Sequence, residues 1–355
     1  PVKNTILLIL IAFLFQTSLQ AQNNINPEIK GNPKTIATTK HKTQKKGKKW
    51  LMGKPISKNF RLFNEKNLLL ENKNYSKGAL KSRMEYLYKT PKYGKALCDR
   101  KTSKKTISTT FLIEDADIIR DFCKKFGKNE ILITYVYNTE KSFTDKKQAY
   151  LLKSSFDVIN KKKQIINQYN FNSLGELENK KTFKYHKKDG LKEITEYDFT
   201  DTLAKKERFS YNKATKTRTH TISDEHGLMT KKIITDFRAN NTLRKKEEFI
   251  YNDVETVRSK VESYYDKKGN KISELFFTAD SLQPIYEYHY QRKVDKKGNW
   301  IYEKRIKMIQ FYGKKIRDKN ESPKFRTRSI SYYGKPHKKT GSKTLRKRNR
   351  RKSKK

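Results

Sequence analysis

The sequence is poor in cysteine, tryptophan, proline and acidic residues. Its 355 residues include 2 Cys, 2 Trp and 8 Pro, and 37 acidic residues stand against 84 Lys and Arg. It has no Cys-x-x-Cys, His-Glu-x-x-His or Gly-x-Ser-x-Gly motif and no phosphate-binding glycine loop, which gives no support for a common metal, hydrolase or nucleotide site. We therefore expect a non-enzymatic protein without catalytic residues, metal or cofactor.

The scarce histidines do not suggest a metal site. His220 and His226 are the closest pair among the six, and a strand followed by a turn would not bring them together. Asp224 next to His226 is explained by a turn that ends at Gly227. We expect both histidines to be solvated.

Cys98 and Cys123 leave two possibilities open. In an exported protein an even pair suggests a disulfide. Cys123 also falls on the apolar face of a predicted helix, where a free thiol would pack well. A catalytic thiol is not favoured because no histidine lies nearby in the sequence.

The opposite feature, positive charge, is present in excess. The net charge is +47, and 66 of the 84 basic residues are lysine. Such a charge attracts polyanions and anionic surfaces. It is concentrated in the tail 334–355, which we expect to be disordered and to contact polyanions through Arg346, Lys347, Arg348, Arg350 and Arg351.

The first 21 residues have the pattern of a signal peptide. Lys3 precedes an unbroken apolar run of ten residues, Ile6 to Phe15, and the following polar segment ends at Ala21. Ten residues are too few to span a bilayer as a helix. We expect export to the periplasm, the outer surface or the medium, with no transmembrane segment left after cleavage.

The remaining chain divides into three further parts before the tail. Residues 22–49 are predicted to be a disordered basic linker, and residues 50–150 a smaller α+β region. In that region Asp115 to Phe126 has an apolar stripe at helical spacing, and Glu130 to Tyr137 is strand-like. Phe60 to Leu70 fits either a helix or a pair of strands.

Residues 151–333 form a degenerate repeat. A leucine followed by an aromatic residue and a tyrosine recurs, as in Leu203, Phe209 and Tyr211, and Asp-x-x-Gly turns recur at Asp224, Asp266 and Asp295. The intervals are close to multiples of 13 residues, enough for one strand and one turn. The prediction is a mainly β fold, an antiparallel β-meander of repeated hairpins in a sandwich or an open curled sheet.

One motif is similar to a known family. The segments 265–270 (Tyr-Asp-Lys-Lys-Gly-Asn) and 294–299 (Val-Asp-Lys-Lys-Gly-Asn) resemble the YD (Rhs-like) β-hairpin repeat, over about residues 165–310. The resemblance implies a secreted hairpin sheet and, for some members of that family, carbohydrate binding or a shell around a toxin.

Aromatic residues recur on the predicted strands and form the candidate binding site. Interleaved with lysine, such rings could stack on sugars or bases, or they could be the core of the meander. The candidates are Tyr265, Tyr286, Tyr288, Trp300 and Tyr302. The favoured function is binding of anionic glycan or another surface polyanion, and the alternatives are nucleic-acid binding through the tail or an exported hydrolase with its site in 50–150.

The signal peptide gives the first testable prediction. The exported protein should begin at or near Gln22, because the charged start, the apolar run and Ala21 together fit signal-peptidase cleavage. Mass spectrometry of the secreted or periplasmic protein measures this. Recovery of a chain that retains residues 1–21 would contradict the expected location.

Overall fold

A computed structural model describes residues 29–89, 124–138, 150–186, 190–279 and 281–334. The signal peptide, Cys98, Cys123, most of the predicted helix and the basic tail lie outside these ranges.

The described chain consists of β-strands joined by short turns. The strands are β1 (Pro33–Lys46), β2 (Lys49–Phe63), β3 (Leu69–Ser76), β4 (Ala79–Lys89), β5 (Glu130–Asn138), β6 (Tyr150–Ile159), β7 (Ile165–Phe171), β8 (Leu177–Tyr185), β9 (Leu191–Asp198), β10 (Leu203–Asn212), β11 (Thr217–Ser223), β12 (Met229–Phe237), β13 (Leu243–Tyr251), β14 (Val257–Tyr265), β15 (Lys271–Thr278), β16 (Tyr286–Val294), β17 (Trp300–Phe311), β18 (Lys314–Arg317) and β19 (Lys324–Tyr332).

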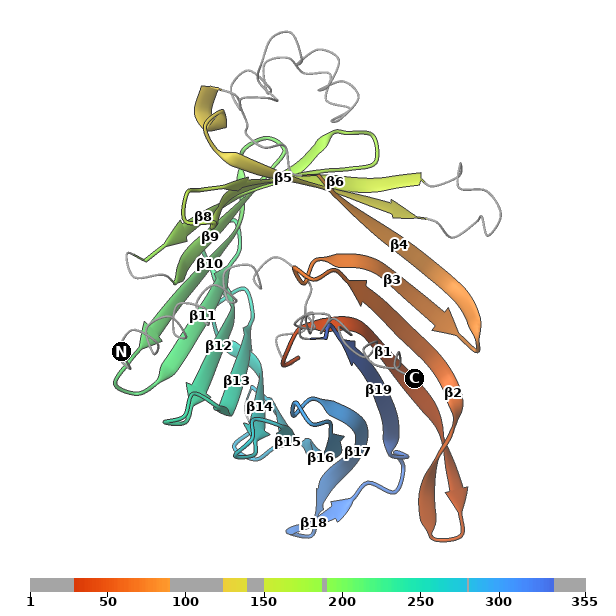
Figure 1. The fold of residues 1–355 in the computed structure, drawn as a ribbon. Coiled ribbons are helices and arrows are strands. Elements are labelled where there is room, and N and C mark those ends of the chain that lie inside the picture. The colour runs from red at the N-terminus through yellow and green to blue at the C-terminus, as the bar shows by residue number, and fades with distance from the viewer. Residues whose placement is uncertain (1–28, 90–123, 139–149, 187–189, 280, 335–355) are drawn as a thin grey trace, which may run out of the picture.

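The strands close into an antiparallel barrel (Figure 1). Each strand pairs with the next along the chain up to β17, which pairs with β19, and β19 pairs with β1 over Pro33 to His41. The short strand β18 pairs with β17 alone and projects from the ring. The predicted order of pairing after residue 150 is confirmed, but the predicted sandwich or open sheet is wrong. The first strand supplies the pairing that the last strand would otherwise lack.

That closing strand comes from a segment predicted to be a disordered linker. Residues 33–46 are β1, whose threonines and isoleucine suit an extended chain despite the many lysines. The segment 50–89 was predicted to belong to a separate α+β region, but β2, β3 and β4 continue the same sheet. Of the helix predicted up to Phe126, residues 124–126 form a helical turn, and Phe60 to Leu70 is a strand pair.

One turn is repeated around the barrel and explains the predicted Asp-x-x-Gly motif. In the β14–β15 turn the Asp266 carboxylate accepts hydrogen bonds from the backbone N–H groups of Lys268 and Asn270, at 2.9 and 2.8 Å. The fourth residue of the turn, Gly269, is left-handed with φ of 81°. Turns with such an Asp or Asn acceptor begin at Asn64, Asn160, Asn172, Asp198, Asp224, Asn252, Asp266 and Asp295.

The left-handed fourth position does not require glycine. Asp201 occupies it with φ of 63° and Asn241 with φ of 59°. The segments Asp201-Thr202-Leu203 and Asn241-Thr242-Leu243 are therefore each the end of the same turn, with Asp or Asn in place of glycine. Both residues tolerate this conformation better than most because their short polar side chains bond locally.

The two faces of the wall can be told apart at β5 to β7. The helical turn 124–126, at the upper left of Figure 1, lies outside the ring, and the Phe126 ring meets the Tyr169 ring at 6.4 Å. Tyr169 shares its face with Phe156, its pairing partner. This outer face carries a buried cluster of Ile131, Ile133, Tyr135, Phe156 and Phe171. The opposite face of the wall lines the inside of the ring.

A second apolar cluster, Ile29, Ile36, Phe63 and Leu69, lies at β1 to β3, but β13 and β14 have no apolar face. Opposite one another on the outer side of β13 and β14 are Glu247 and Glu262, and the inner side of the same strand pair carries the ion pair of Lys246 with Glu248 at 2.9 Å. The expected division into one apolar and one charged face is not observed there. The strands are joined instead by backbone bonds and by cross-strand pairs such as Lys245 with Glu262 at 3.3 Å.

The repeated turn gives a prediction on stability. Asp266→Ala removes the acceptor of two backbone N–H groups and should lower the free energy of unfolding by about 1 to 2 kcal/mol. Urea denaturation measures the difference. The matched control is Asp253→Ala, since in the β13–β14 turn Asn252 is the acceptor and Asp253 is exposed. An equal loss in the two variants would contradict the role of the carboxylate.

Candidate polyanion-binding rim and inner wall

The turns divide into two sets because an antiparallel ring alternates them between its two ends. One end holds the turns β2–β3, β6–β7, β8–β9, β10–β11, β12–β13, β14–β15 and β16–β17. We call it the lysine rim after its exposed lysines, which are Lys66, Lys161, Lys162, Lys163, Lys213, Lys267, Lys268, Lys296 and Lys297. The described residues of these turns include one exposed acidic side chain, Glu65.

The carboxylates of the aspartates that start two of these turns accept hydrogen bonds from the backbone N–H groups of the turn. Burial alone would raise the pKa of Asp266, but hydrogen bonds from Asn270 and from the Lys268 backbone lower it below its ordinary value. The carboxylate therefore stays ionised while it holds the turn. Lys267 and Lys268 occupy the two middle positions and point to solvent. The Tyr-Asp-Lys-Lys-Gly-Asn motif thus fixes an exposed pair of lysines on a rigid turn.

The chain start is tied to the lysine rim. Asn299, buried just after the β16–β17 turn, accepts the Lys30 N–H at 2.6 Å and donates to the Lys30 carbonyl at 2.8 Å. Asn299 also donates to the Tyr332 hydroxyl at 2.6 Å, and Tyr332 donates to Asp295 at 2.5 Å. One amide side chain therefore joins the start of β1, the end of β19 and a lysine turn.

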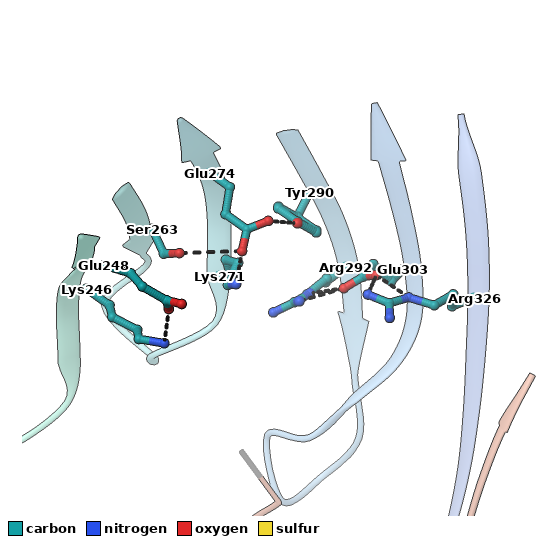
Figure 2. A network of polar contacts seen from close by, with 9 residues as sticks. All are labelled: Lys246, Glu248, Ser263, Lys271, Glu274, Tyr290, Arg292, Glu303 and Arg326. Carbon is teal, nitrogen blue, oxygen red and sulfur yellow. Dashed lines mark hydrogen bonds and ion pairs between the residues drawn. The ribbon is translucent and has the colours of Figure 1, made fainter. Parts of the chain in front are cut away.

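Below that turn the inner wall holds a cluster of arginines around Trp300. Figure 2 shows Glu303 between Arg292 and Arg326, with Nε to carboxylate distances of 2.8 and 2.7 Å. Glu303 is 1% exposed. The guanidinium carbon of Arg328 lies 3.7 Å from the centre of the Trp300 ring. Arginine suits this position because its flat cation stacks on a ring while bonding a carboxylate with its edge.

Further along the inner wall, tyrosines alternate with cations. Arg305 stacks on Tyr288 at 4.1 Å, and Lys307 lies 5.0 Å from the centre of the Tyr286 ring. Burial raises the pKa of Tyr288, so its hydroxyl stays protonated. Figure 2 also shows the Tyr290 hydroxyl donating to Glu274, which Lys271 contacts as well. These side chains are half-buried and form a polar, cation-rich strip.

The predicted aromatic candidates do not form one platform. Tyr286, Tyr288 and Trp300 share the inner wall, whereas Tyr302 lies on the outer face opposite Thr327. Tyr265 and Trp300 are 8% and 5% exposed. A bulge after the turn separates Trp300 from Tyr302, because Lys293 and Val294 are neighbours but pair with Tyr302 and Trp300. Simple alternation would have placed the two rings on one face.

The rim lysines were not identified as a site from the sequence, although the sequence contains the Asp-Lys-Lys-Gly motif. The Asp-Lys-Lys-Gly segments were interpreted as turns, and the charge was assigned to the tail. The signal that could have found the rim is the even number of strands between successive Lys-Lys turns, which brings them to the same end of the barrel.

The histidines stay apart, as the sequence suggested, but the expectation that both are solvated is wrong for His220, which is half-buried. His220 bonds Glu207 at 2.9 Å and stacks on Phe209, while His226 is exposed in the β11–β12 turn. The His220 hydrogen bond lowers the pKa of Glu207 to about 2. Within the described ranges no group of three His, Cys, Asp or Glu side chains could hold a metal ion. The same ranges contain no helix long and apolar enough to cross a membrane.

A second feature of the inner wall is a hollow of about 170 Å³ between β4 and β7. Asp157 lines it and is 5% exposed, with Gln168 donating to its carboxylate at 2.7 Å. Tyr86, Leu132 and Lys153 also line the hollow. Burial raises the pKa of Asp157 to about 6 although the Gln168 bond lowers it.

Comparison with known proteins identifies no family for the chain. No family model matches, and no curated protein matches. Among solved structures, a porin-like protein from Bacteroides uniformis is 9% identical with a TM-score of 0.38, covering 84% of this chain and 96% of that one. A protein of unknown function from Bacteroides fragilis is 12% identical with a TM-score of 0.22, covering 39% of this chain and 91% of that one.

A third solved structure has a still lower TM-score. The Photorhabdus luminescens Tc holotoxin pore is 8% identical with a TM-score of 0.15, and the match covers 74% of this chain and 20% of that one. Similarities this low assign neither fold nor function. The sheet of repeated hairpins that the resemblance implied is instead confirmed by the strand pairing of this chain.

Asp157 gives a prediction on pH dependence. Its pKa is higher in the folded state than the ordinary 3.8, so ionisation destabilises the fold as pH rises from about 4 to about 6, by up to roughly 3 kcal/mol. Asp157→Asn cannot ionise and keeps an acceptor for Gln168. The melting temperature of the variant should match the wild type below pH 4 and exceed it above pH 6. A difference that does not change with pH would contradict the assignment.

Proposed function

We propose that this chain is a non-enzymatic, exported barrel protein whose lysine rim binds an anionic glycan or another surface polyanion. The observation that carries the proposal is the gathering of lysine-tipped turns at one end of the ring. An Asp or Asn side chain accepts backbone hydrogen bonds within each lysine-tipped turn, so the charges lie on rigid turns and not on a flexible segment.

The rim suits a polymer better than a small ligand. Its lysines come from separate hairpins spread over β2 to β17, and Lys161, Lys267 and Lys296 each represent a different turn. An extended polyanion can contact several turns at once and releases counterions at each contact. Lysine is a hydrated point charge without fixed hydrogen-bond geometry, so selectivity among anionic polymers should be low.

The proposal takes the barrel wall to face water. A lipid-facing wall has a continuous apolar band, whereas the outer side of β13 and β14 carries Lys245, Glu247 and Glu262 at mid-strand. Such charges are costly in hydrocarbon. Together with the signal-peptide pattern, this favours a place in the periplasm, at the outer surface or outside the cell.

Nucleic acid is the alternative polyanion. The tail with Arg346, Lys347 and Arg348 would contact it without sequence preference, and the rim lysines would add to the same electrostatic term. The export pattern favours a glycan, because an exported protein meets surface polymers. Binding measurements on both glycan and nucleic acid decide between the two ligands.

The rim is tested with four substitutions in the full mature chain: Lys161→Gln, Lys162→Gln, Lys267→Gln and Lys296→Gln. All four side chains are exposed. We expect elution from heparin at lower salt. For single-stranded DNA the slope of log affinity against log salt should fall by about 3, since each lost contact contributes roughly 0.7.

The matched control carries Lys48→Gln, Lys49→Gln, Lys77→Gln and Lys314→Gln, which remove the same charge from exposed turns at the other end of the barrel. It should elute close to the wild type. Equal shifts in the two variants would mean that net charge alone governs binding. Retention on DNA without retention on heparin would favour the nucleic-acid alternative.

A further inference from the structure

The end of the barrel opposite the lysine rim carries exposed apolar side chains on its turns. It holds the turns β1–β2, β3–β4, β7–β8, β9–β10, β11–β12, β13–β14, β15–β16 and β17–β18. Large apolar residues exposed in these turns are Leu174, Phe199, Val254, Leu282, Ile285, Phe311 and Tyr312. We call this end the apolar rim.

All of these side chains are at least half exposed, and two are almost fully exposed. Leu282 is 96% exposed and Tyr312 90%, and Val254, Leu174 and Phe199 each exceed two-thirds. In the described turns of the lysine rim, no large apolar side chain is exposed to this degree. The turn geometry is the same at both ends, with the acceptors Asn172 and Asp266 as examples, so the difference lies only in the residues at the tips.

Basic side chains lie next to the apolar tips at one side of this end, whereas the tips Leu174, Phe199 and Val254 neighbour exposed acids, namely Glu176, Asp201, Asp253 and Glu255. In the β17–β18 hairpin Lys314 and Lys315 follow Phe311 and Tyr312 after Gly313, and no acidic residue occurs between 304 and 317. The β1–β2 hairpin lies beside it, since Arg317 stacks on Trp50 at 5.1 Å. The segment 33–63 also lacks acidic residues and exposes Leu51 and Met52.

We propose that the apolar rim docks this protein on the surface of an anionic lipid membrane. Apolar tips on separate hairpins suit a membrane surface, because all of them can insert into the lipid interface at once. The exposed lysines of the two neighbouring hairpins complement anionic head groups. The charged wall between the rims stays in water, so the barrel stands on the membrane and presents the lysine rim on its far side.

The test uses vesicle co-sedimentation of the full mature chain with phosphatidylcholine vesicles that contain or lack phosphatidylglycerol. The rim variant carries Leu174→Ser, Phe199→Ser, Leu282→Ser and Tyr312→Ser. We expect the wild type to bind the anionic vesicles, and the rim variant to require about tenfold more lipid or more for half-binding. Heparin elution of this variant should not change.

The control variant removes four exposed apolar side chains near the lysine rim: Leu87→Ser, Ile272→Ser, Val294→Ser and Ile301→Ser. It should bind vesicles like the wild type, and melting curves of both variants verify that they fold. Equal vesicle binding by the rim variant would overturn the proposal. So would binding that high salt abolishes irrespective of the tips, or a tip-dependent dimer in sedimentation velocity, which would identify a second copy as the partner.

The two proposals fail separately. Loss of vesicle binding in the rim variant with heparin binding retained supports the membrane contact. Loss of heparin binding in the lysine variant with vesicle binding retained supports the polyanion site. If the wild type binds no vesicles of either composition, the membrane proposal is wrong and the lysine rim is unaffected.

Discussion

The pairing of β1 with β19 is the constraint on which the rest of the structure depends. The wall is apolar mainly at β5 to β7 and at the cluster of Ile29, Ile36, Phe63 and Leu69 beside the seam, so most of its strands are held by backbone hydrogen bonds and cross-strand contacts. A sheet of this kind with free edges would expose two rows of unpaired backbone groups. Closure over Pro33 to His41 removes both edges, and Asn299 fastens the seam by bonding Lys30 and Tyr332.

Charge is distributed to fit that closed wall. On several strands lysine and arginine are paired with carboxylates, as in Arg292, Glu303 and Arg326, where a buried acid is bonded on both sides, whereas β1 and β2 carry no acidic residue. An unmatched charge at such a position would be costly. The surplus lysines are found where water is close, in turns such as 161–163 and 267–268 and in the sequence of the tail.

The two rims acquire different chemistry from one turn geometry. The Asp or Asn acceptor and the left-handed fourth residue leave the middle positions free of structural demands. Those positions are filled by lysine at several turns of one end, and by leucine, phenylalanine or valine at three described turns of the other. The two ends of the barrel therefore differ in chemistry, and both proposals follow from this difference.

The sequence by itself determined the strands and turns after residue 150 and their order. Leu177, Leu203 and Leu243 each begin a strand, and Gly227, Gly269 and Gly298 each end a turn, because leucine and glycine placement reflects local backbone preference. Only the tertiary structure decided the closure by β1, which depends on pairing across some 290 residues. It also decided the faces of Trp300 and Tyr302, because a bulge interrupts the alternation, and the sorting of turn tips into two rims, because this depends on counting strands around a ring.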